Sequence, residues 1–389
     1  MTTTQNSTRT WMVIVTTLTG FAASAAAYPP DNAAVLYYKA FMLYQPDDEI
    51  TPLLWDYWKG TIETNEKIEQ YIEKNRRIID VVLDATRIDL CDWGLDYSQG
   101  TEMLLPPHHN ARELFVLLAA EATMQASTGD YRKALGRCLT LYRMARHLNE
   151  RPIISYLVGT AIMAATDTCV TRFLGEMPLD VETLTWLRSE LAAFDKDPYS
   201  IDHVLRWKRE AGIISMSPDK IGRAIQAGVD DSPGKTKALE RLREADPQFF
   251  ARNTAYWNTF MDEVQAAFDL PYTEAYARLR KLDEQPTRDF DQDPDATLTA
   301  CIAPTFLRIY VLDLRLRTKA NALRTAVELY LTRATTGNLP ETLPEGLPGD
   351  LFSGKPFQYA RTPDGFVLRC RQEDLDKKEP YEYSFKAAE

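Results

Sequence analysis

The sequence lacks the short motifs that mark common enzyme classes. It contains no G-x-S-x-G, H-E-x-x-H, Walker or Rossmann pattern. The five cysteines, at positions 91, 138, 169, 301 and 370, form no C-x-x-C pair and no metal-ligand spacing. A disulfide framework is therefore not expected, although in an exported protein one pair could still bridge, and the odd count leaves at least one thiol free. Cys138 and Cys169 fall within helical patterns, so we expect them to be small buried apolar residues.

Basic residues are fewer than acidic residues in this sequence. The 45 lysines and arginines are outnumbered by 56 aspartates and glutamates, which gives a formal net charge of -11. A nucleic-acid partner needs a surplus of basic residues on one face, so this class of partner is not expected. The one local basic patch consists of Arg206, Lys208 and Arg209 around Trp207. It indicates either an anion site or, in keeping with the acidic balance, a salt-bridged helix face.

Glycine and Val-rich alternating stretches are scarce. Only 17 of the 389 residues are glycine, whereas tracts rich in Ala, Leu, Glu and Arg are long. Hydrophobic residues make up 45% of the chain, which is enough to fill a core, and the length allows two or three domains. The composition therefore predicts a mainly α-helical protein.

The first thirty residues have the order of a secretory signal peptide. Arg9 precedes an apolar run from Trp11 to Ala23, and the small residues Ser24 to Ala27 come before Tyr28. We therefore expect residues 1–27 to be removed and the protein to be periplasmic or secreted. Loss of Arg9, the only charge in this segment, would take the net charge from -11 to -12. The threonines in the run and the single basic residue leave an uncleaved N-terminal anchor as the alternative.

Apolar residues recur at spacings of three and four through most of the chain, which predicts a series of helices. One helix is expected from about Glu63 to Leu83, a loop from Asp89 to His109, and a polar linker from Asp283 to Asp295. The other expected helices cover residues 32–44, 50–58, 110–127, 131–148, 152–175, 180–194, 200–216, 218–227, 235–244, 247–268, 272–282 and 304–335.

Two of these helices are apolar enough to raise the question of a membrane. The run from Ile153 to Ala165 is too short to span a bilayer and is followed at once by Asp167 and Arg172, so we expect a central buried helix. The last and longest helix carries charged residues from Arg308 to Lys319, which exclude a membrane span.

Beyond Gly337 the pattern changes to strands. Three alternating runs, around Phe357, Phe366 and Tyr383, predict a small antiparallel β meander stacked on the long helix. The predicted fold is mainly α, an irregular array of helical hairpins with this meander at its C-terminus. We expect a helical-hairpin domain over residues 28–300, and the long helix with its β module over residues 301–389.

The segment Gly129–Leu135 (GDYRKAL), followed by Cys138, Leu141 and Ala145, resembles the second helix of a tetratricopeptide repeat (TPR). In such repeats a turn glycine, an aromatic residue and a small residue let two helices pack closely. The resemblance covers one unit, and no second unit follows in register. It implies a TPR-like helical hairpin rather than a regular array.

The C-terminal stretch resembles the globular end of pseudopilins. A long helix is followed by Gly337–Pro340 (GNLP), Leu347–Asp350 (LPGD), Gly354–Tyr359 (GKPFQY) and Gly365–Leu368 (GFVL). In that family the helix begins with a membrane-inserted N-terminus, whereas here it lies late in the chain and carries charges. The resemblance implies a shared module rather than a shared role in assembly.

The order of features along the whole chain is similar to a group of uncharacterised exported helical proteins that are abundant in planctomycetes and their relatives. The features are the signal segment, Asn32–Tyr38 (NAAVLYY), the loop with Cys91–Trp93, the Gly129–Tyr131 hairpin turn and the Pro-rich meander. The resemblance implies the architecture and brings no activity, cofactor or catalytic residue.

Two clusters of potential metal ligands are present. The adjacent His108 and His109 point apart in a loop, and His147 and His203 follow no H-x-x-x-H spacing, so we expect no metal there. The alternate aspartates at positions 289, 291, 293 and 295 imitate the start of a calcium loop. Position six of that loop is Pro294 instead of Gly and position twelve is Ala300 instead of Glu, so a solvated acidic linker is the preferred interpretation.

Aromatic residues and carboxylates cluster near the predicted loop. Trp55, Trp58, Trp93 and Tyr97 lie close in sequence to Asp92 and Asp96. A helical-toroid glycoside hydrolase would use such a pair of aspartates as acid and as base or nucleophile, beside aromatic platforms for sugar rings. The competing hypothesis is that the same four aromatic residues line a groove that binds a partner.

We expect an exported helical scaffold that binds a protein or cell-envelope partner in a groove between helical hairpins, bordered by residues 89–109. No cofactor, no metal and no catalytic residue is assigned. The alternatives are the glycoside hydrolase with Asp92 and Asp96, and an envelope structural component that uses the pilin-like end for assembly. The oligomeric state is left open.

The N-terminal segment gives the first testable prediction. Protein isolated from its native host is expected to begin at or near Tyr28, because the small-residue site follows an apolar run too short and too rich in threonine for a stable anchor. N-terminal sequencing measures this directly. Recovery of intact Met1 in the membrane fraction would show that the segment is kept as an anchor.

Overall fold

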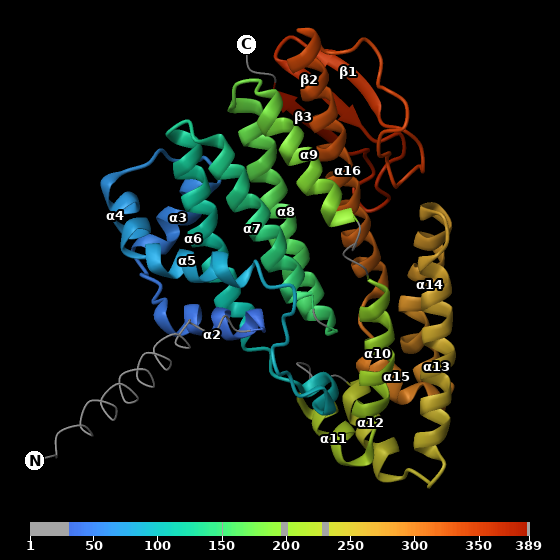
Figure 1. Ribbon diagram of the computed structural model, residues 1–389. Coiled ribbons are helices and arrows are strands. Elements are labelled where there is room, and N and C mark those ends of the chain that lie inside the picture. Colours follow the sequence, from blue (N-terminus) through green and yellow to red (C-terminus); the bar gives the residue numbers. More distant parts are fainter. Residues whose placement is uncertain (1–30, 150, 196–200, 228–232, 387–389) are drawn as a thin grey trace, which may run out of the picture.

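The structure is a computed structural model that describes residues 31–149, 151–195, 201–227 and 233–386. The expected signal peptide, residues 1–27, lies outside the described residues. Within them the chain forms fifteen α-helices and one small antiparallel sheet near the C-terminus (Figure 1). The predicted fold class, mainly α with a C-terminal β meander, is confirmed.

Four short helices form the N-terminal end of the molecule. α2 packs against α5, and α3 packs against the next long helix, α6. Asn32 begins α2, because its side chain accepts a hydrogen bond from the backbone of Ala34 at 3.1 Å. The four helices are α2 (Ala33–Leu43), α3 (Ile50–Trp58), α4 (Glu66–Lys74) and α5 (Arg76–Ala85).

The single helix expected from Glu63 to Leu83 is wrong, because the chain divides at Asn75 into α4 and α5. The Asn75 side chain donates to the backbone carbonyl of Tyr71 at 2.8 Å and is itself buried. Asparagine forms such local bonds in competition with the helical backbone, which ends α4 and allows α5 to leave at a new angle.

A helical hairpin follows, formed by α6 (Pro107–Ser127) and α7 (Tyr131–Leu148). Gly129 connects them at a φ of 83°, where glycine is strongly favoured, and the Asp130 side chain caps α7 by accepting from Lys133 N at 3.2 Å. Ala134 of α7 is fully buried, as are Ala119 and Ala120 of α6. The predicted hairpin is therefore present, while its likeness to a TPR stays a prediction.

The long helices of the centre are α8 (Ile153–Glu176), α9 (Val181–Asp195) and α16 (Phe306–Thr336). Figure 1 shows α16 running from the sheet at one end to the lower helices at the other, beside α8 and α9. By length and composition, α8 and the segment 294–336 could cross a membrane, but half of each apolar window is buried inside the protein. A core helix passes the same test, so this finding assigns no membrane span.

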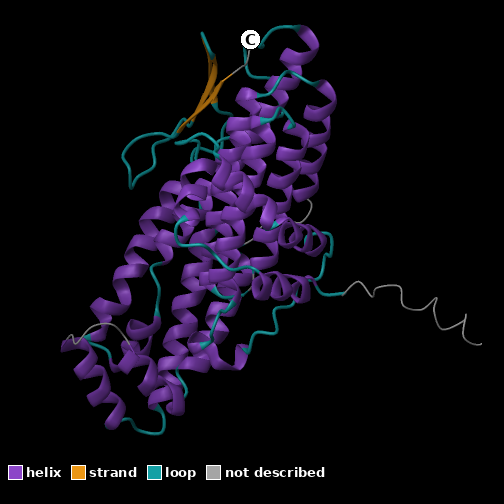
Figure 2. Ribbon diagram, turned by 90° about the vertical axis from the view of Figure 1, so that its left-hand side faces the viewer, coloured by secondary structure: helices purple, strands orange, loops and turns teal. Residues whose placement is uncertain are grey.

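A second group of helices packs around the lower half of α16 (Figures 1 and 2). α14 contacts both α13 and α16, and α10 contacts α13 and α8. The group consists of α10 (Asp202–Ser215), α11 (Pro218–Ala227), α12 (Pro233–Arg243), α13 (Phe249–Phe268), α14 (Tyr272–Phe290), the 3₁₀ helix η3 (Pro294–Ala296) and α15 (Thr297–Ile302).

The polar linker expected from Asp283 to Asp295 is wrong. α14 continues to Phe290 through an internal Pro286, and η3 follows. An internal proline costs a helix about 3 kcal/mol. Leu282, Pro286 and Phe290 recur at a spacing of four and are all buried, so tertiary packing of this face outweighs the loss.

The C-terminal sheet has the strand order β1-β2-β3, with both pairs antiparallel. Its strands are β1 (Gln358–Thr362), β2 (Gly365–Arg369) and β3 (Glu382–Lys386). Phe366 pairs with Phe385 across the sheet, and its ring lies 5.4 Å from that of Tyr330 on α16. Aromatic side chains thus attach one face of the sheet to the long helix.

One hydrophobic core runs through the helical body and the sheet, from Ala33 to Phe385. All five cysteines lie within the described residues and are free thiols. Cys138 and Cys169 are buried, as predicted from their positions in helical patterns. Burial raises the pKa of the Cys169 thiol to about 11, so these residues act as small apolar groups of the core.

The α6–α7 hairpin gives a stability prediction. Ala134→Leu places a larger side chain at a fully buried position and is expected to lower the free energy of unfolding by about 1–3 kcal/mol. Chemical denaturation measures the change. Ala251→Leu, at an exposed alanine of α13, is the matched control and is expected to cost much less. Equal stability of the two variants would mean that the hairpin is not closely packed.

Candidate functional site

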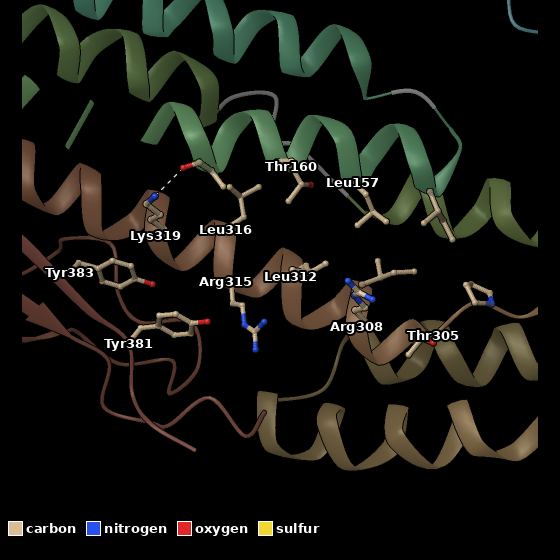
Figure 3. Close-up of a pocket in the computed structure, with 15 residues that line it drawn as sticks. Leu157, Thr160, Thr305, Arg308, Leu312, Arg315, Leu316, Lys319, Tyr381 and Tyr383 are labelled. Carbon is tan, nitrogen blue, oxygen red and sulfur yellow. Dashed lines mark hydrogen bonds between the residues drawn. The ribbon is translucent and has the colours of Figure 1, made fainter. Parts of the chain in front are cut away.

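A groove lies between α8 and α16 and ends at the C-terminal sheet (Figure 3). Its volume is about 670 Å³, within the usual range of small-molecule and peptide sites. The α8 side of the groove is formed partly by small side chains. On α8 these residues include Ala161 and Ala164, which keep the helix surface low.

The walls of the groove are mainly apolar. Leu157 of α8 faces Leu312 and Leu316 of α16 across it, as Figure 3 shows. Thr160 lies in the α8 wall with 7% of its surface exposed, and its hydroxyl has no hydrogen-bond partner in the described structure. The other apolar residues of the lining are Ile153, Ala161, Ala164, Pro304 and Ile309.

Three cationic residues follow the α16 side of the groove. Arg308, Arg315 and Lys319 are seven and four residues apart, which places them on one face of the helix. Lys319 donates to the carbonyl of Ala164 at 3.0 Å and to Thr168 Oγ1 at 2.9 Å. Arg308 is exposed and, within the described part of the chain, makes no ion pair or hydrogen bond. The groove therefore combines an apolar floor with a free positive charge.

The end of the groove near the sheet is built by aromatic residues and a fixed arginine. Tyr381 and Tyr383 lie there, and Figure 3 places the Arg315 guanidinium beside Tyr381. Arg315 Nε donates to Asp374 Oδ2 at 2.7 Å, and Nη2 donates to Asp376 Oδ2 at 3.1 Å. Because the Asp374 side chain is fully buried, this pair fixes both the arginine and the loop before β3.

Two buried tyrosine–aspartate pairs lie behind the groove walls. Tyr142 of α7 donates to Asp167 of α8, and Tyr156 of α8 donates to Asp313 of α16. Burial raises the pKa of Asp167 to about 6, against the opposing effects of Lys319, the Tyr142 hydrogen bond and Arg324. Burial likewise raises the pKa of Asp313. These pairs join α7, α8 and α16 by hydrogen bonds within an apolar interior.

The structure distributes the four predicted aromatic residues over three clusters. Trp55 and Trp58 contact each other at 5.5 Å between ring centroids and pack against α6. Trp93 is buried, stacks on Phe41 at 6.1 Å, and donates from Nε1 to the His147 carbonyl at 2.7 Å. Tyr97 packs against Trp207 at 6.3 Å. The sequence led us to expect these four residues along one groove. In the structure they lie in three separate places.

The two predicted carboxylates are held in turns of the 89–109 segment. Asp92 Oδ1 accepts from Gly94 N at 2.9 Å. Asp96 accepts from Ser98 Oγ at 2.6 Å and from Gln99 Nε2 at 2.8 Å, and these bonds lower its pKa. A general acid in glycoside hydrolysis needs a raised pKa, which is the opposite direction. The hydrolase alternative stays a prediction without support from this geometry.

The segment 89–109 is more regular than the predicted loop. It contains the 3₁₀ helix η2 (Tyr97–Glu102), and α6 begins at Pro107, before the predicted start at Asn110. The segment borders two cavities of about 350 Å³ each, one lined by Trp93 and Asp96, the other by Gly100 and Trp207. Its first residue, Asp89, also lines a cavity of about 570 Å³ beside α7 and α9. The larger groove between α8 and α16 is formed by other elements.

The remaining candidate residues are engaged in the fold. His108 bonds to Ser155 at 2.9 Å. The four aspartates of the imitated calcium loop diverge: Asp289 accepts from Tyr256, Asp291 from Lys237, Asp293 from the Asp295 backbone, and Asp295 from Arg252. No group of three or more metal-ligating residues is found in the part of the chain that the structure describes.

The sequence signal for the α8–α16 groove was present in two places. One was the apolar run with small residues in α8, and the other was the spacing of Arg308, Arg315 and Lys319 in α16. The first stretch by itself predicts a buried helix, and the charges of the second by themselves indicate only that the helix does not span a membrane. Only the tertiary contact between the two helices shows that these stretches face one cavity.

Asp167 gives a prediction about pH dependence. A carboxyl group whose pKa is raised by folding makes its full contribution to stability below its pKa in the unfolded chain, which is about 4. This contribution is lost as the pH rises through the folded-state pKa of Asp167, which is about 6. Asp167→Asn is expected to remove that loss. The decrease in unfolding free energy between pH 4 and 7.5 should be smaller in the variant by about 2–3 kcal/mol.

Urea denaturation at several pH values measures this difference. Asp80→Asn, at an exposed carboxylate of α5, is the control and is expected to follow the parent protein. A parallel pH profile for the Asp167 variant and the parent would contradict the burial of an ionisable carboxylate at this position.

Comparison of the chain with models of known protein families, with curated proteins and with solved structures finds no match. A function is therefore inferred from the geometry of the α8–α16 groove.

Proposed function

We propose that this protein is an exported helical scaffold that binds a protein or another cell-envelope component in the groove between α8 and α16. The observation that carries the proposal is the combination of an apolar groove of about 670 Å³ with cationic residues along one side. An occupant with apolar groups and negative charge complements both features.

The groove is supported by rigid elements, as a preformed binding site requires. Its two sides are α8, with 24 residues, and α16, with 31 residues. Arg315 is fixed by Asp374 and Asp376, so its position is set before any partner arrives. Arg308, which is exposed and unpaired within the described residues, is the group that a partner carboxylate or phosphate would reach first.

The lining of the groove favours binding over glycoside hydrolysis. Among the described residues that line it, none carries a carboxylate. Acid and base catalysis of this reaction uses a pair of carboxyl groups on either side of the bond that breaks. In Figure 1 the helices follow one another from α3 through α6, α7, α8 and α16 to α14 as an open stack, which also fits a scaffold.

Export is part of the proposal, and it rests on the order of residues 9–28. The role of the C-terminal sheet as an assembly module is the alternative proposal. The attachment of the sheet to α16 through Tyr330 supports a structural role for it inside the protein, where it closes one end of the groove.

Blocking the groove tests the proposal. Ala161→Trp introduces a large side chain at an exposed position of the groove lining. It is expected to reduce capture of a partner from envelope extract by about tenfold or more, since the groove is filled. Quantitative mass spectrometry of material bound to the immobilised protein measures the change for each captured component.

The matched control is Ala251→Trp, at an exposed alanine on α13 that does not line the groove. It is expected to capture the same components as the parent protein. Undiminished capture by the Ala161 variant would overturn the proposal. Release of reducing sugar from a polysaccharide panel by the parent protein, abolished in Asp92→Asn or Asp96→Asn, would favour the hydrolase instead.

A further inference from the structure

A second cavity lies beside the first turn of α8, away from the sheet. Its volume is about 350 Å³, and it is bounded by the 89–109 segment, α10 and the junction between α15 and α16. It shares only Ile153 and Pro304 with the α8–α16 groove. Most of its wall is apolar and includes Met103, Leu105, Trp207, Ile153 and Ile302.

The wall of this cavity contains a buried lysine. Lys208 of α10 has 6% of its surface exposed, and its Nζ donates to the carbonyl of Ile302 at 3.0 Å. An ammonium group has three N–H donors, and this is the one hydrogen bond that the described residues provide. No carboxylate of the described chain forms an ion pair with it. Lys208 and Ile302 both belong to the cavity lining.

Trp257 packs closely against α10 near this lysine. Gly212, one turn further along α10, has no side chain, and a Cβ there would lie 2.5 Å from the Trp257 indole. Trp257 can therefore approach α10 and donate from Nε1 to the Arg209 carbonyl at 2.9 Å. The Lys208 ammonium lies 5.7 Å from the same indole ring. The indole attracts the cation but leaves its charge uncompensated.

A buried cation without a carboxylate partner is costly to the protein. Lysines at such positions are paired, neutralised or retained for a ligand. Burial lowers the pKa of Lys208 to about 8, so the amine is still mostly protonated at neutral pH. An incoming carboxylate can supply the missing charge and accept the unused N–H donors at the same time.

We propose that this cavity binds an apolar monocarboxylate of the fatty-acid class, with Lys208 as the counter-ion of its carboxylate. The acyl chain lies against Met103, Leu105, Ile153 and Ile302. Ile154, which is 59% exposed, borders the cavity and gives the chain an apolar edge at the surface. The proposal goes beyond partner binding in the α8–α16 groove and does not depend on it.

The basic patch noted in the sequence is thereby resolved into separate roles. Arg209 forms an ion pair with Asp262 at 2.6 Å, as expected of a salt-bridged helix face. Lys208 turns inward instead, and Trp207 contributes to the wall beside it. Lys208 is the buried residue of the patch, and it forms no ion pair with any described residue, so it is the one assigned to the ligand.

Discrimination between an acid and its ester tests the proposal. Dodecanoic acid and methyl dodecanoate share an acyl chain, and only the acid carries a negative charge. Titration of the purified protein at pH 7, followed by the NMR signal of carboxyl-labelled dodecanoate with the ester as competitor, compares their affinities. The parent protein is expected to bind the acid about tenfold or more tightly than the ester.

Lys208→Met keeps the length of the side chain and removes its charge, so it is expected to abolish the preference for the acid. Lys208→Arg keeps a positive charge at this position and is expected to retain part of the parent protein's preference for the acid. Lys281→Met, at an exposed lysine of α14, is the control and should bind both molecules as the parent does. Thermal unfolding confirms that each variant is folded.

Equal affinity of the parent protein for acid and ester would overturn the proposal, as would an unchanged preference in the Lys208→Met variant. Trapping of dodecanal on Lys208 by borohydride without binding of the acid would also overturn it, since the amine would then act as a nucleophile. Ala161→Trp, which fills the α8–α16 groove, is expected to leave acid binding unchanged. The two proposals can therefore fail separately.

Discussion

The contact between α8 and α16 is the constraint on which the rest of the structure depends. α8 packs against both α7 and α16, so it joins the N-terminal helices to the long C-terminal helix. α16 in turn contacts α9, α14 and β3. A groove of about 670 Å³ remains between the two helices along part of this contact. The same contact that holds the fold together thus creates the candidate site.

In the described part of the chain, the buried charged side chains each hydrogen-bond to another side chain, with one exception. Glu121 of α6 is fully buried and is bound by Arg76 and Arg137, and the Asp167 and Asp313 carboxylates each accept from a tyrosine. These groups have partners that offset part of the cost of burial. Lys208 departs from this rule, because its one hydrogen bond goes to a backbone carbonyl. That departure is the reason to assign it a ligand.

Most helix boundaries could be predicted from sequence, because their signals are local. Asp130 caps α7, Gly129 ends the turn before it, and Gly337 ends α16 at a φ of 82°. The break at Asn75 and the continuation of α14 through Pro286 could not, since side-chain competition and tertiary burial decided them. The α8–α16 groove could not be predicted either, because its two walls are distant in sequence. Trp93, one of the aromatic residues from which the sequence predicted a groove, packs against Phe41 instead.

The central claim is that the α8–α16 groove is where a partner binds. Site-specific photo-crosslinking measures this most directly, with a benzoylphenylalanine in place of Leu312 inside the groove and a second probe in place of Ala251 on α13. The account predicts that the groove probe, in cells of the native host, crosslinks one defined envelope component and that the α13 probe does not. Crosslinks of equal yield from both positions, or none from Leu312, would contradict it.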